Sequence, residues 1–89
     1  MNIFYRDSSC WLGWSDVDGI ISIHAEINQW SISAYKHYLS VFNSFLNQFP
    51  SGTLIYSVAK TEKAKKFNKL LGLHEFGKQE GGFIMRIEV

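Results

Sequence analysis

His24 and Glu26 stand two residues apart in the run IISIHAEI, Ile20–Ile27, and either side chain could take a proton from an amine. The run alternates apolar and polar residues, which predicts a half-buried strand whose polar side chains share one face. The chemistry indicated is general-base catalysis by one of the two residues. Polar side chains on the outer face of a strand are also ordinary, and we favour that simpler interpretation.

Cysteine and histidine spacing gives no second catalytic signal. Cys10 and the three histidines, His24, His37 and His74, show no spacing typical of a metal site. No nucleophile motif surrounds Cys10, so we expect neither a metal nor a catalytic cysteine. One cysteine excludes an internal disulfide and favours a reducing compartment, so a cytoplasmic location is expected.

The composition predicts one small domain, residues 1–89, without repeats or a linker. A net charge of +1 makes no global case for nucleic acid, a membrane surface or an acidic protein as a partner. No basic amino-terminal leader and no apolar run of about 18 residues is present, so we expect neither export nor membrane insertion. Seven Phe, four Tyr and three Trp supply the bulk that the core of a short chain needs.

Three strands are predicted before the first helix. They run from Ile3 to Arg6, from Cys10 to Ser15 and from Ile20 to Ile27. The segment Asp16-Val17-Asp18-Gly19 has the acidic and glycine residues that tight hairpins favour, so it is predicted to form the turn between the last two strands.

An apolar stripe predicts a long helix from about Ser31 to Phe49. Its members recur at steps of three and four residues, and they are Ile32, Tyr35, Leu39, Phe42, Leu46 and Phe49. Ser31 or Ser33 can cap the start, and Pro50-Ser51-Gly52 ends the helix. The stripe covers fewer than three heptads and lacks charge pairing, so a helix packed on a sheet is favoured over a coiled coil.

The segment from Thr53 to Gly77 predicts strand, helix, strand. The strand Thr53–Ala59 is apolar on both faces, as in a covered sheet. Thr61 offers an N-cap hydroxyl, and Gly72 supplies the left-handed residue that ends a helix. A short strand from His74 follows, and a final strand, Phe83–Val89, comes after a polar loop.

The helix and the strand after it resemble the last helix and strand of the GNAT family of N-acetyltransferases. The stretch is TEKAKKFNKLLGLHEFG, and the usual family pattern is N-x-x-A-x-x-F-Y-x-x-x-G-F-x-x-x-G. The residues that match in register are Ala64, Phe67, Gly72, Leu73 and Gly77. Thr61 stands where the family usually has Asn, and Asn68 where it usually has Tyr.

The resemblance implies an α+β fold with a mixed, α/β-like sheet in the order βββαβαββ. This is the family order from its second strand onward, without the family's first strand and the two helices after it. In the family, that front part helps to form the acceptor side of the cleft. Its absence implies either a very open cleft or a surface rebuilt for another task.

The family holds the pyrophosphate of acetyl-CoA on backbone N–H groups of Q/R-x-x-G-x-G/A at the start of the long helix. Gln29–Ala34 is the corresponding segment, and Ile32 replaces its middle glycine. A β-branched side chain hinders close approach of phosphate to the backbone, so we expect no cofactor and a capped helix start with Ile32 facing the core. If the chain is an enzyme, its cofactor is acetyl-CoA. The candidates for cofactor contacts are Gln29, Ser31, Ser33, Ala34 and Asn68.

The family often protonates the departing thiolate of CoA with the tyrosine that Asn68 replaces. An amide cannot release a proton at neutral pH, so this role is lost or has moved. Tyr56 or Tyr35 could stand in for it, although we favour a core or rim position for both.

Five of the nine basic residues fall on the predicted second helix: Lys60, Lys63, Lys65, Lys66 and Lys69. A solvated helix face is the simpler interpretation. The alternative is binding of an acidic partner or of the phosphates of CoA. Lysines without arginine or stacking aromatics are weak evidence for nucleic acid.

Two functions are compatible with these residues. The first is a non-catalytic GNAT-like protein that binds a partner macromolecule, and such proteins are similar to small phage and mobile-element proteins, including inhibitors of host defence. The alternative is a minimal acetyl-CoA-dependent N-acetyltransferase that acts on a protein lysine. The Ile32 and Asn68 substitutions favour the first.

Aromatic residues near the start predict where a protein partner, or a second copy in a homodimer, would bind. Trp11 and Trp14 fall on opposite faces of their strand, so one is expected to fill the core under the long helix. The other is expected to form a binding surface with Tyr5 or Phe4, because aromatic residues dominate binding hot spots.

Overall fold

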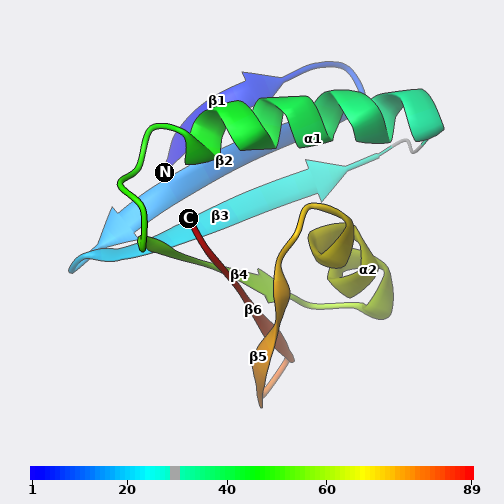
Figure 1. The fold of residues 1–89 in the computed structure, drawn as a ribbon. Coiled ribbons are helices and arrows are strands. Elements are labelled where there is room, and N and C mark those ends of the chain that lie inside the picture. The colour runs from blue at the N-terminus through cyan, green and yellow to red at the C-terminus, as the bar shows by residue number, and fades with distance from the viewer. Residues whose placement is uncertain (29–30) are drawn as a thin grey trace.

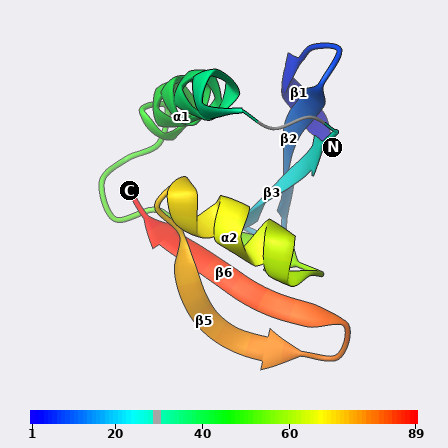
Figure 2. The same cartoon turned by 90° about the vertical axis from the view of Figure 1, so that its right-hand side faces the viewer.

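Six strands form one mixed sheet that carries both helices on the same face (Figures 1 and 2). The computed structural model describes residues 1–28 and 31–89. The strands are β1 (Asn2–Arg6), β2 (Cys10–Val17), β3 (Ile20–Ile27), β4 (Leu54–Ala59), β5 (His74–Gln79) and β6 (Gly82–Glu88), and the helices are α1 (Ile32–Leu46) and α2 (Glu62–Leu70). The order along the chain is the predicted one, and the described residues form a small compact α+β domain with a radius of gyration of 12.4 Å.

The sheet order is β1-β2-β3-β4-β6-β5. β3 and β4 are parallel neighbours and α1 is the crossover between them, while the other pairs are antiparallel. A parallel pair needs such a crossover because its strands cannot be joined by a tight turn. β2 and β3 form a hairpin that turns at Asp18 and Gly19, both with positive φ, which is the two-residue turn that fits strand twist. The strand β2 therefore extends to Val17, two residues beyond the prediction, because only two residues are needed to turn the chain.

One hydrophobic core joins the two helices to the sheet. Phe42 and Phe45 of α1 meet Ile55 of β4 and Met85 of β6, and all four are 2% exposed or less. Ala64 and Phe67 of α2 pack against the same core. The opposite face of the sheet carries no helix in the part of the chain that the structure describes (Figures 1 and 2).

The apolar stripe of α1 is buried less evenly than predicted. The buried residues of α1 are Tyr38, Phe42 and Phe45, and of these only Phe42 belongs to the stripe. Ile32, expected to face the core, is 76% exposed. At about 100° per residue, ten residues place Ile32 roughly 80° around the helix axis from Phe42, on the side away from Tyr38 and Phe45. The helix also ends at Leu46, earlier than predicted, with Asn47 as its C-cap.

Both helices start at the predicted caps. Ser31 Oγ accepts a hydrogen bond from the Ala34 N–H at 3.0 Å, and Thr61 Oγ1 accepts one from the Ala64 N–H at 3.0 Å. These bonds satisfy N–H groups that have no partner within the helix. Gly72 follows α2 with a φ of 103°, which confirms its predicted left-handed conformation.

A bulge in β1 turns two neighbouring aromatic side chains to the helix side of the sheet. Ile3 pairs with Gly13 and Tyr5 with Leu12, so Phe4 is the extra residue. The Phe4 ring stacks on Phe45, and the Tyr5 ring meets Tyr38 edge-on. Both contacts attach the edge strand to α1.

Asp7 organises the turn after β1. Its Oδ1 accepts hydrogen bonds from the backbone N–H of Ser9 at 2.7 Å and of Cys10 at 2.9 Å. The Tyr5 hydroxyl donates to its other oxygen, Oδ2. The bond to Tyr5, followed by those to Ser9, holds the pKa of the Asp7 carboxyl well below its usual range. The same bond raises the pKa of Tyr5 to about 12.

Among residues 1–28 and 31–89, no helix is long and apolar enough to cross a membrane.

Candidate functional site

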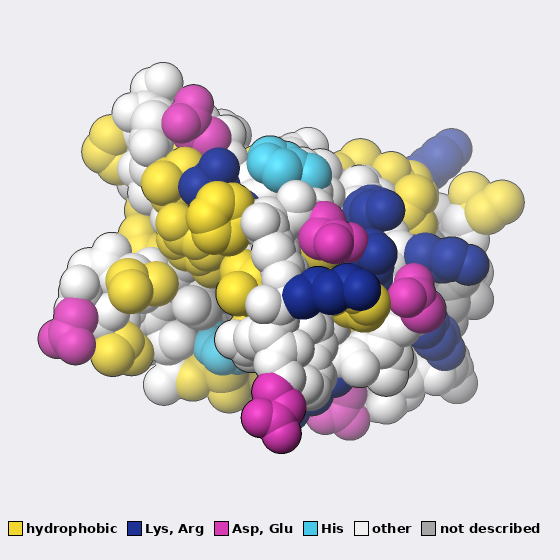
Figure 3. Space-filling view, turned by 90° about the horizontal axis from the view of Figure 1, so that it is seen from below, with side chains coloured by type: hydrophobic (Ala, Val, Ile, Leu, Met, Phe, Trp, Pro, Cys, Tyr) yellow, Lys and Arg dark blue, Asp and Glu magenta, His cyan; other side chains and the backbone are white. Residues whose placement is uncertain are grey.

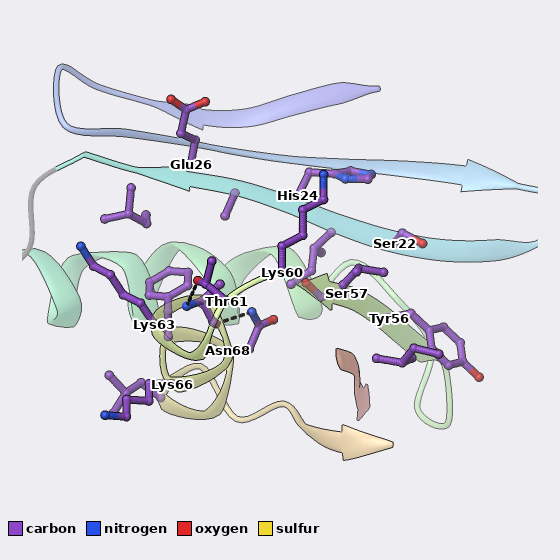
Figure 4. Close-up of a pocket in the computed structure, with 18 of the residues that line it drawn as sticks. Ser22, His24, Glu26, Tyr56, Ser57, Lys60, Thr61, Lys63, Lys66 and Asn68 are labelled. Atoms are coloured by element: carbon purple, nitrogen blue, oxygen red, sulfur yellow. Dashed lines mark hydrogen bonds between the residues drawn. The ribbon is translucent and has the colours of Figure 1, made fainter. Parts of the chain in front are cut away.

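A groove of about 980 Å³ opens where β3 and β4 separate (Figure 4). The two strands pair only at Ile21–Ile55 and Ser22–Tyr56. Beyond that point β3 forms one wall and α2 the other, with the end of β4 and part of β6 between them. The volume lies within the range of about 300–1,000 Å³ typical of ligand pockets. The lining of the groove is mostly apolar.

The separation leaves part of β3 with a strand neighbour on one side only. β2 pairs with β3 as far as Cys10–Ile27, whereas the β3–β4 ladder ends at Ser22. The Asn28 N–H donates to the Ser9 carbonyl, which fixes the alternation of the antiparallel ladder. By that alternation the backbone N–H and C=O groups of Ala25 and Ile27 are directed away from β2 and toward the groove. The described residues therefore offer a free strand edge inside a walled groove.

Three lysines form the positive wall of the groove. Lys60 lies between β4 and the N-cap of α2, and Lys63 and Lys66 lie one turn apart on α2. Figure 3 shows Lys and Arg side chains gathered on one side of the face seen from below, beside a region of hydrophobic side chains. In Figure 4, Lys60 extends across the groove toward His24.

The other lysines of this segment are directed elsewhere. Lys65 Nζ lies 2.6 Å from Glu75 Oε1 of β5 and over the ring of Phe83. The hydrogen bond of this pair raises the pKa of Lys65 and lowers that of Glu75. Lys69 is exposed and is not part of the described lining. The five lysines predicted as one group thus divide into groove lysines and others, with Lys65 in the one ion pair found among the described residues.

His24 and Glu26 lie on one face of β3 and line the groove, as their alternation predicts (Figure 4). His24 Nε2 is 3.0 Å from Ser15 Oγ, and Glu26 accepts a hydrogen bond from Trp11 Nε1 at 3.2 Å. Both side chains are exposed and held by neighbours on β2. Glu26 is the only carboxylate in the described lining, and in Figure 4 its side chain extends away from α2.

Asn68 is 6% exposed and lies on the groove side of α2. Its Nδ2 donates to the Ala64 carbonyl at 2.8 Å (Figure 4). The amide is thus held against its own helix, and it has no proton to release at neutral pH.

The two tyrosines that could replace a family acid contact other parts of the chain. Tyr56 stands at the far end of the groove and points away from α2 (Figure 4). Its ring meets Phe76 edge-on, at 6.2 Å between centroids. Tyr35 donates its hydroxyl to the Leu70 carbonyl at 3.2 Å and so connects α1 to α2.

The predicted cofactor residues are not brought together. Ser31 caps α1, Ser33 and Ala34 follow in its first turn, and none of these three is part of the described groove lining. Asn68 is in that lining. Gln29 lies outside the described residues. The Ile32 side chain projects from the helix start toward solvent, where it stands beside the N–H groups that an anion would need.

The aromatic residues predicted as a partner surface divide between the two faces of the sheet. Trp14 packs against Phe45 and Phe49, and Phe4 and Tyr5 lie on the same helix side. Trp11 lies on the other face and lines the groove. The structure therefore places Trp11 with the groove and does not place it with Phe4 or Tyr5.

Sequence reasoning missed the apolar residues that close the groove. Val58 and Ile84 are cross-strand partners on the face opposite the helices, and both belong to its lining. The signal was present, because strand Thr53–Ala59 is apolar on both faces although only one face carries a helix. Within residues 1–28 and 31–89, no group of three His, Cys, Asp or Glu side chains is placed to hold a metal ion.

Comparison with known proteins gives no match to a protein-family model, to a curated protein or to a solved structure.

Proposed function

We propose that this chain is a GNAT-like protein without acetyltransferase activity, which works by binding a partner macromolecule in the groove between β3 and β4. The observation that carries the proposal is the free edge of β3 beyond Ser22, set in a mostly apolar groove. Backbone groups at such an edge pair readily with an extended chain. The small phage-encoded GNAT-like proteins that this chain resembles include inhibitors of host defence. A host defence protein is therefore one kind of partner that fits the proposal.

The side chains around the groove support binding more than proton transfer. Asn68 occupies the position of the usual acid, and its amide is bonded to Ala64. Tyr56 points away from Asn68, so it would have to reorient to act there. His24 and Glu26 remain as polar contacts for a ligand on the β3 wall.

The start of α1 supports the same proposal. Ile32 is exposed where the family has the glycine of its phosphate loop, and the predicted contacts Ser31, Ser33 and Ala34 lie outside the described groove lining. A cofactor held at the helix start would lack the close backbone approach that phosphate needs.

The alternative function, an acetyl-CoA-dependent N-acetyltransferase for a protein lysine, is favoured by one observation. The free edge of β3 could pair with the amide groups of the pantetheine arm, and Lys60, Lys63 and Lys66 could meet the phosphates. His24 or Glu26 would then take the proton from the acceptor amine. This function shares the groove with the first, so ligand binding separates them.

The deciding experiment titrates acetyl-CoA against the thermal unfolding of the full chain. We expect no saturating shift. With a dissociation constant above about 1 mM, about 1 mM ligand stabilises the fold by at most about 0.4 kcal/mol. A saturating shift at micromolar acetyl-CoA, with transfer of the acetyl group to a lysine peptide, would reject the proposal in favour of the enzyme.

A second arm tests partner binding directly. A photo-crosslinking residue at Val58, which lines the groove and is 47% exposed, should capture a protein from an extract of the cells in which the chain is expressed. The matched control is Val17, which is 63% exposed at the β2–β3 hairpin and is not part of the described lining. The captured protein is then purified, and its affinity for the wild-type chain is measured. Equal capture from both positions, or no measurable affinity, would contradict the proposal.

A further inference from the structure

The free edge of β3 determines the shape of the ligand that would fit the groove. Ala25 and Ile27 direct backbone donors and acceptors into it at the two-residue spacing of a strand. β4 leaves the edge after Ser22, and α2 closes the far side. A ligand that satisfies these groups must itself be extended and must carry amides at the same spacing, which describes a peptide segment in β conformation.

The charged side chains on the groove walls determine which net charge the bound segment should carry. Lys60, Lys63 and Lys66 belong to the described lining of the groove, and Glu26 is the one carboxylate in it. Among the described residues the only ion pair is Lys65–Glu75, so the three groove lysines have no carboxylate partner. Glu62 lies in the first turn of α2, and His24 is on the β3 wall. The balance is positive and complements an acidic segment.

The apolar part of the lining determines how apolar and acidic residues should be arranged along that segment. Ile27, Val58 and Ile84 offer contacts for apolar side chains. Successive side chains of an extended segment point to opposite faces, so one set can lie on apolar residues while the other meets the lysines. A sequence that alternates apolar and acidic residues satisfies both surfaces.

From these three observations we infer that the groove binds an extended acidic segment of a partner protein, which adds as a strand to β3. The inference rests on the proposed function and names the chemistry of its partner. The segment hydrogen-bonds the backbone at Ala25 and Ile27, and its carboxylates lie against Lys60, Lys63 and Lys66.

Single-stranded nucleic acid is the rival macromolecule for a basic groove. It is bound by rows of stacking aromatics along a basic path, often with arginine. The described lining holds no arginine. Its aromatic residues are Trp11, Tyr56 and Phe67, and Tyr56 points away from α2, where the lysines lie. The free strand edge has no counterpart in that mode of recognition, so the observations favour a peptide.

The test uses the full chain, labelled with ¹⁵N, and a blocked nine-residue peptide of alternating valine and glutamate. We expect saturable binding, with the largest amide shifts at Ala25 and Ile27, and an affinity at least about tenfold above that of the matching valine–lysine peptide. A third peptide, N-methylated at alternate residues, keeps the charge but loses the N–H groups. It should not bind measurably.

Charge-reversal variants test the lysine wall. Lys63→Glu and Lys66→Glu should each weaken binding of the valine–glutamate peptide by about tenfold. Lys69→Glu is the matched control, because Lys69 is exposed on the same helix but is not part of the described lining. It should change the affinity by less than about twofold. All three changes are on the helix surface, and circular dichroism checks that the variants fold.

The outcomes separate this inference from the proposed function. If the valine–lysine peptide binds equally well with shifts at Ala25 and Ile27, the acidic preference is overturned, while binding of a protein in the groove stands. If the N-methylated peptide binds like its parent, strand addition is overturned. If no peptide binds and acetyl-CoA saturates, both proposals fail. Tighter binding of a single-stranded oligonucleotide at the same salt concentration would overturn the inference in favour of nucleic acid.

Discussion

The ring of Phe4 stacks on the ring of Phe45, with 4.4 Å between centroids and 9° between planes. Phe4 belongs to the edge strand β1, and Phe45 to the last turn of α1. The contact exists because the bulge opposite Leu12 turns Phe4 to the same side as Tyr5. It attaches a short edge strand to the core of the domain.

Replacing Phe4 by alanine should therefore lower the free energy of unfolding by about 2 kcal/mol, less than for a fully buried Phe because its side chain is half-buried. The control is Ile3→Ala, since Ile3 is 43% exposed and should cost less than about 1 kcal/mol. Urea denaturation measures both. Equal losses would show that the stacking contact does not stabilise the edge strand.

Two residues of the predicted stripe on α1 should differ sharply in the effect of alanine. Phe42 is 1% exposed, and Phe42→Ala should cost roughly 3–5 kcal/mol through lost burial and the cavity that remains. Ile32→Ala should change stability by less than about 0.5 kcal/mol, because the side chain is 76% exposed. Chemical denaturation of both variants is the measurement. A large loss for Ile32→Ala would contradict its position.

The contrast shows what periodicity can and cannot predict. The steps of three and four residues identified α1 and its packing on the sheet. The two serines near its start left the cap open between Ser31 and Ser33, and the structure uses Ser31. They did not identify the centre of the buried face, because a stripe of period 3.5 drifts around a helix of period 3.6. Ile32 and Phe42 belong to one stripe in the sequence, but only Phe42 reaches the core.

The two glycines of the family-like motif should respond differently to alanine. Gly72 has a φ of 103°, and an added Cβ would lie 3.3 Å from Ile87 Cδ1. Gly72→Ala should therefore cost about 1–2 kcal/mol in backbone strain. Gly77 is not in the left-handed region and an added Cβ meets nothing within 4 Å, so Gly77→Ala should be neutral within about 0.5 kcal/mol. Thermal unfolding of the pair tests whether the motif glycines have the same role.

The motif predicted local features well and the groove not at all. Thr61 as N-cap and Gly72 as the helix-ending residue follow from local backbone chemistry, and both are found. The point where β3 and β4 part depends on pairing between segments more than 30 residues apart, so no short pattern records it. The bulge at Phe4 could not be predicted for the same reason, because it is defined by the pairing of β1 with β2.

Acid should destabilise the turn at Asp7 in a defined pH window. The pKa of Asp7 is lowered in the folded state from an ordinary value of 3.8, so its stabilising effect is present above about pH 4 and is lost as the pH falls further. Asp7→Asn should be less stable than wild type at neutral pH, and the difference should shrink below about pH 4. The hydrogen bond to Asp7 raises the pKa of Tyr5 to about 12 in the folded state. The stability that this bond supplies is therefore lost at alkaline pH, as the pH rises from about 10 to 12.

The measurement is the free energy of unfolding at a series of pH values and at constant ionic strength, because exposed charges are screened by salt. Asp16→Asn is a useful control, since Asp16 accepts a hydrogen bond from the Gly19 N–H in a different turn. A constant difference between wild type and Asp7→Asn down to about pH 2 would contradict the role given to the Asp7 carboxylate.

The last prediction separates the two tryptophans of β2. Trp14 lies between Phe45 and Phe49, at 5.9 and 5.8 Å between ring centroids, and Trp14→Ala should cost about 2–4 kcal/mol. Trp11 lies on the other face, bonded to Glu26 and lining the groove. Trp11→Ala should cost about 1 kcal/mol or less, yet it should weaken binding of the valine–glutamate peptide by about tenfold, since aromatic residues dominate binding hot spots.

Urea denaturation measures the stability of both variants, and peptide titration measures their affinity for the valine–glutamate peptide. Size-exclusion chromatography reports any dimer. Trp14→Ala should unfold more readily but bind the peptide normally. Trp11→Ala should keep most of its stability but bind the peptide more weakly. If the chain is a dimer that Trp11→Ala dissociates without any change in peptide affinity, the exposed face of Trp11 is a self-association surface. If both variants lose stability alike and neither changes binding or association, Trp11 belongs to the core, and the groove lacks the aromatic contact assigned to it.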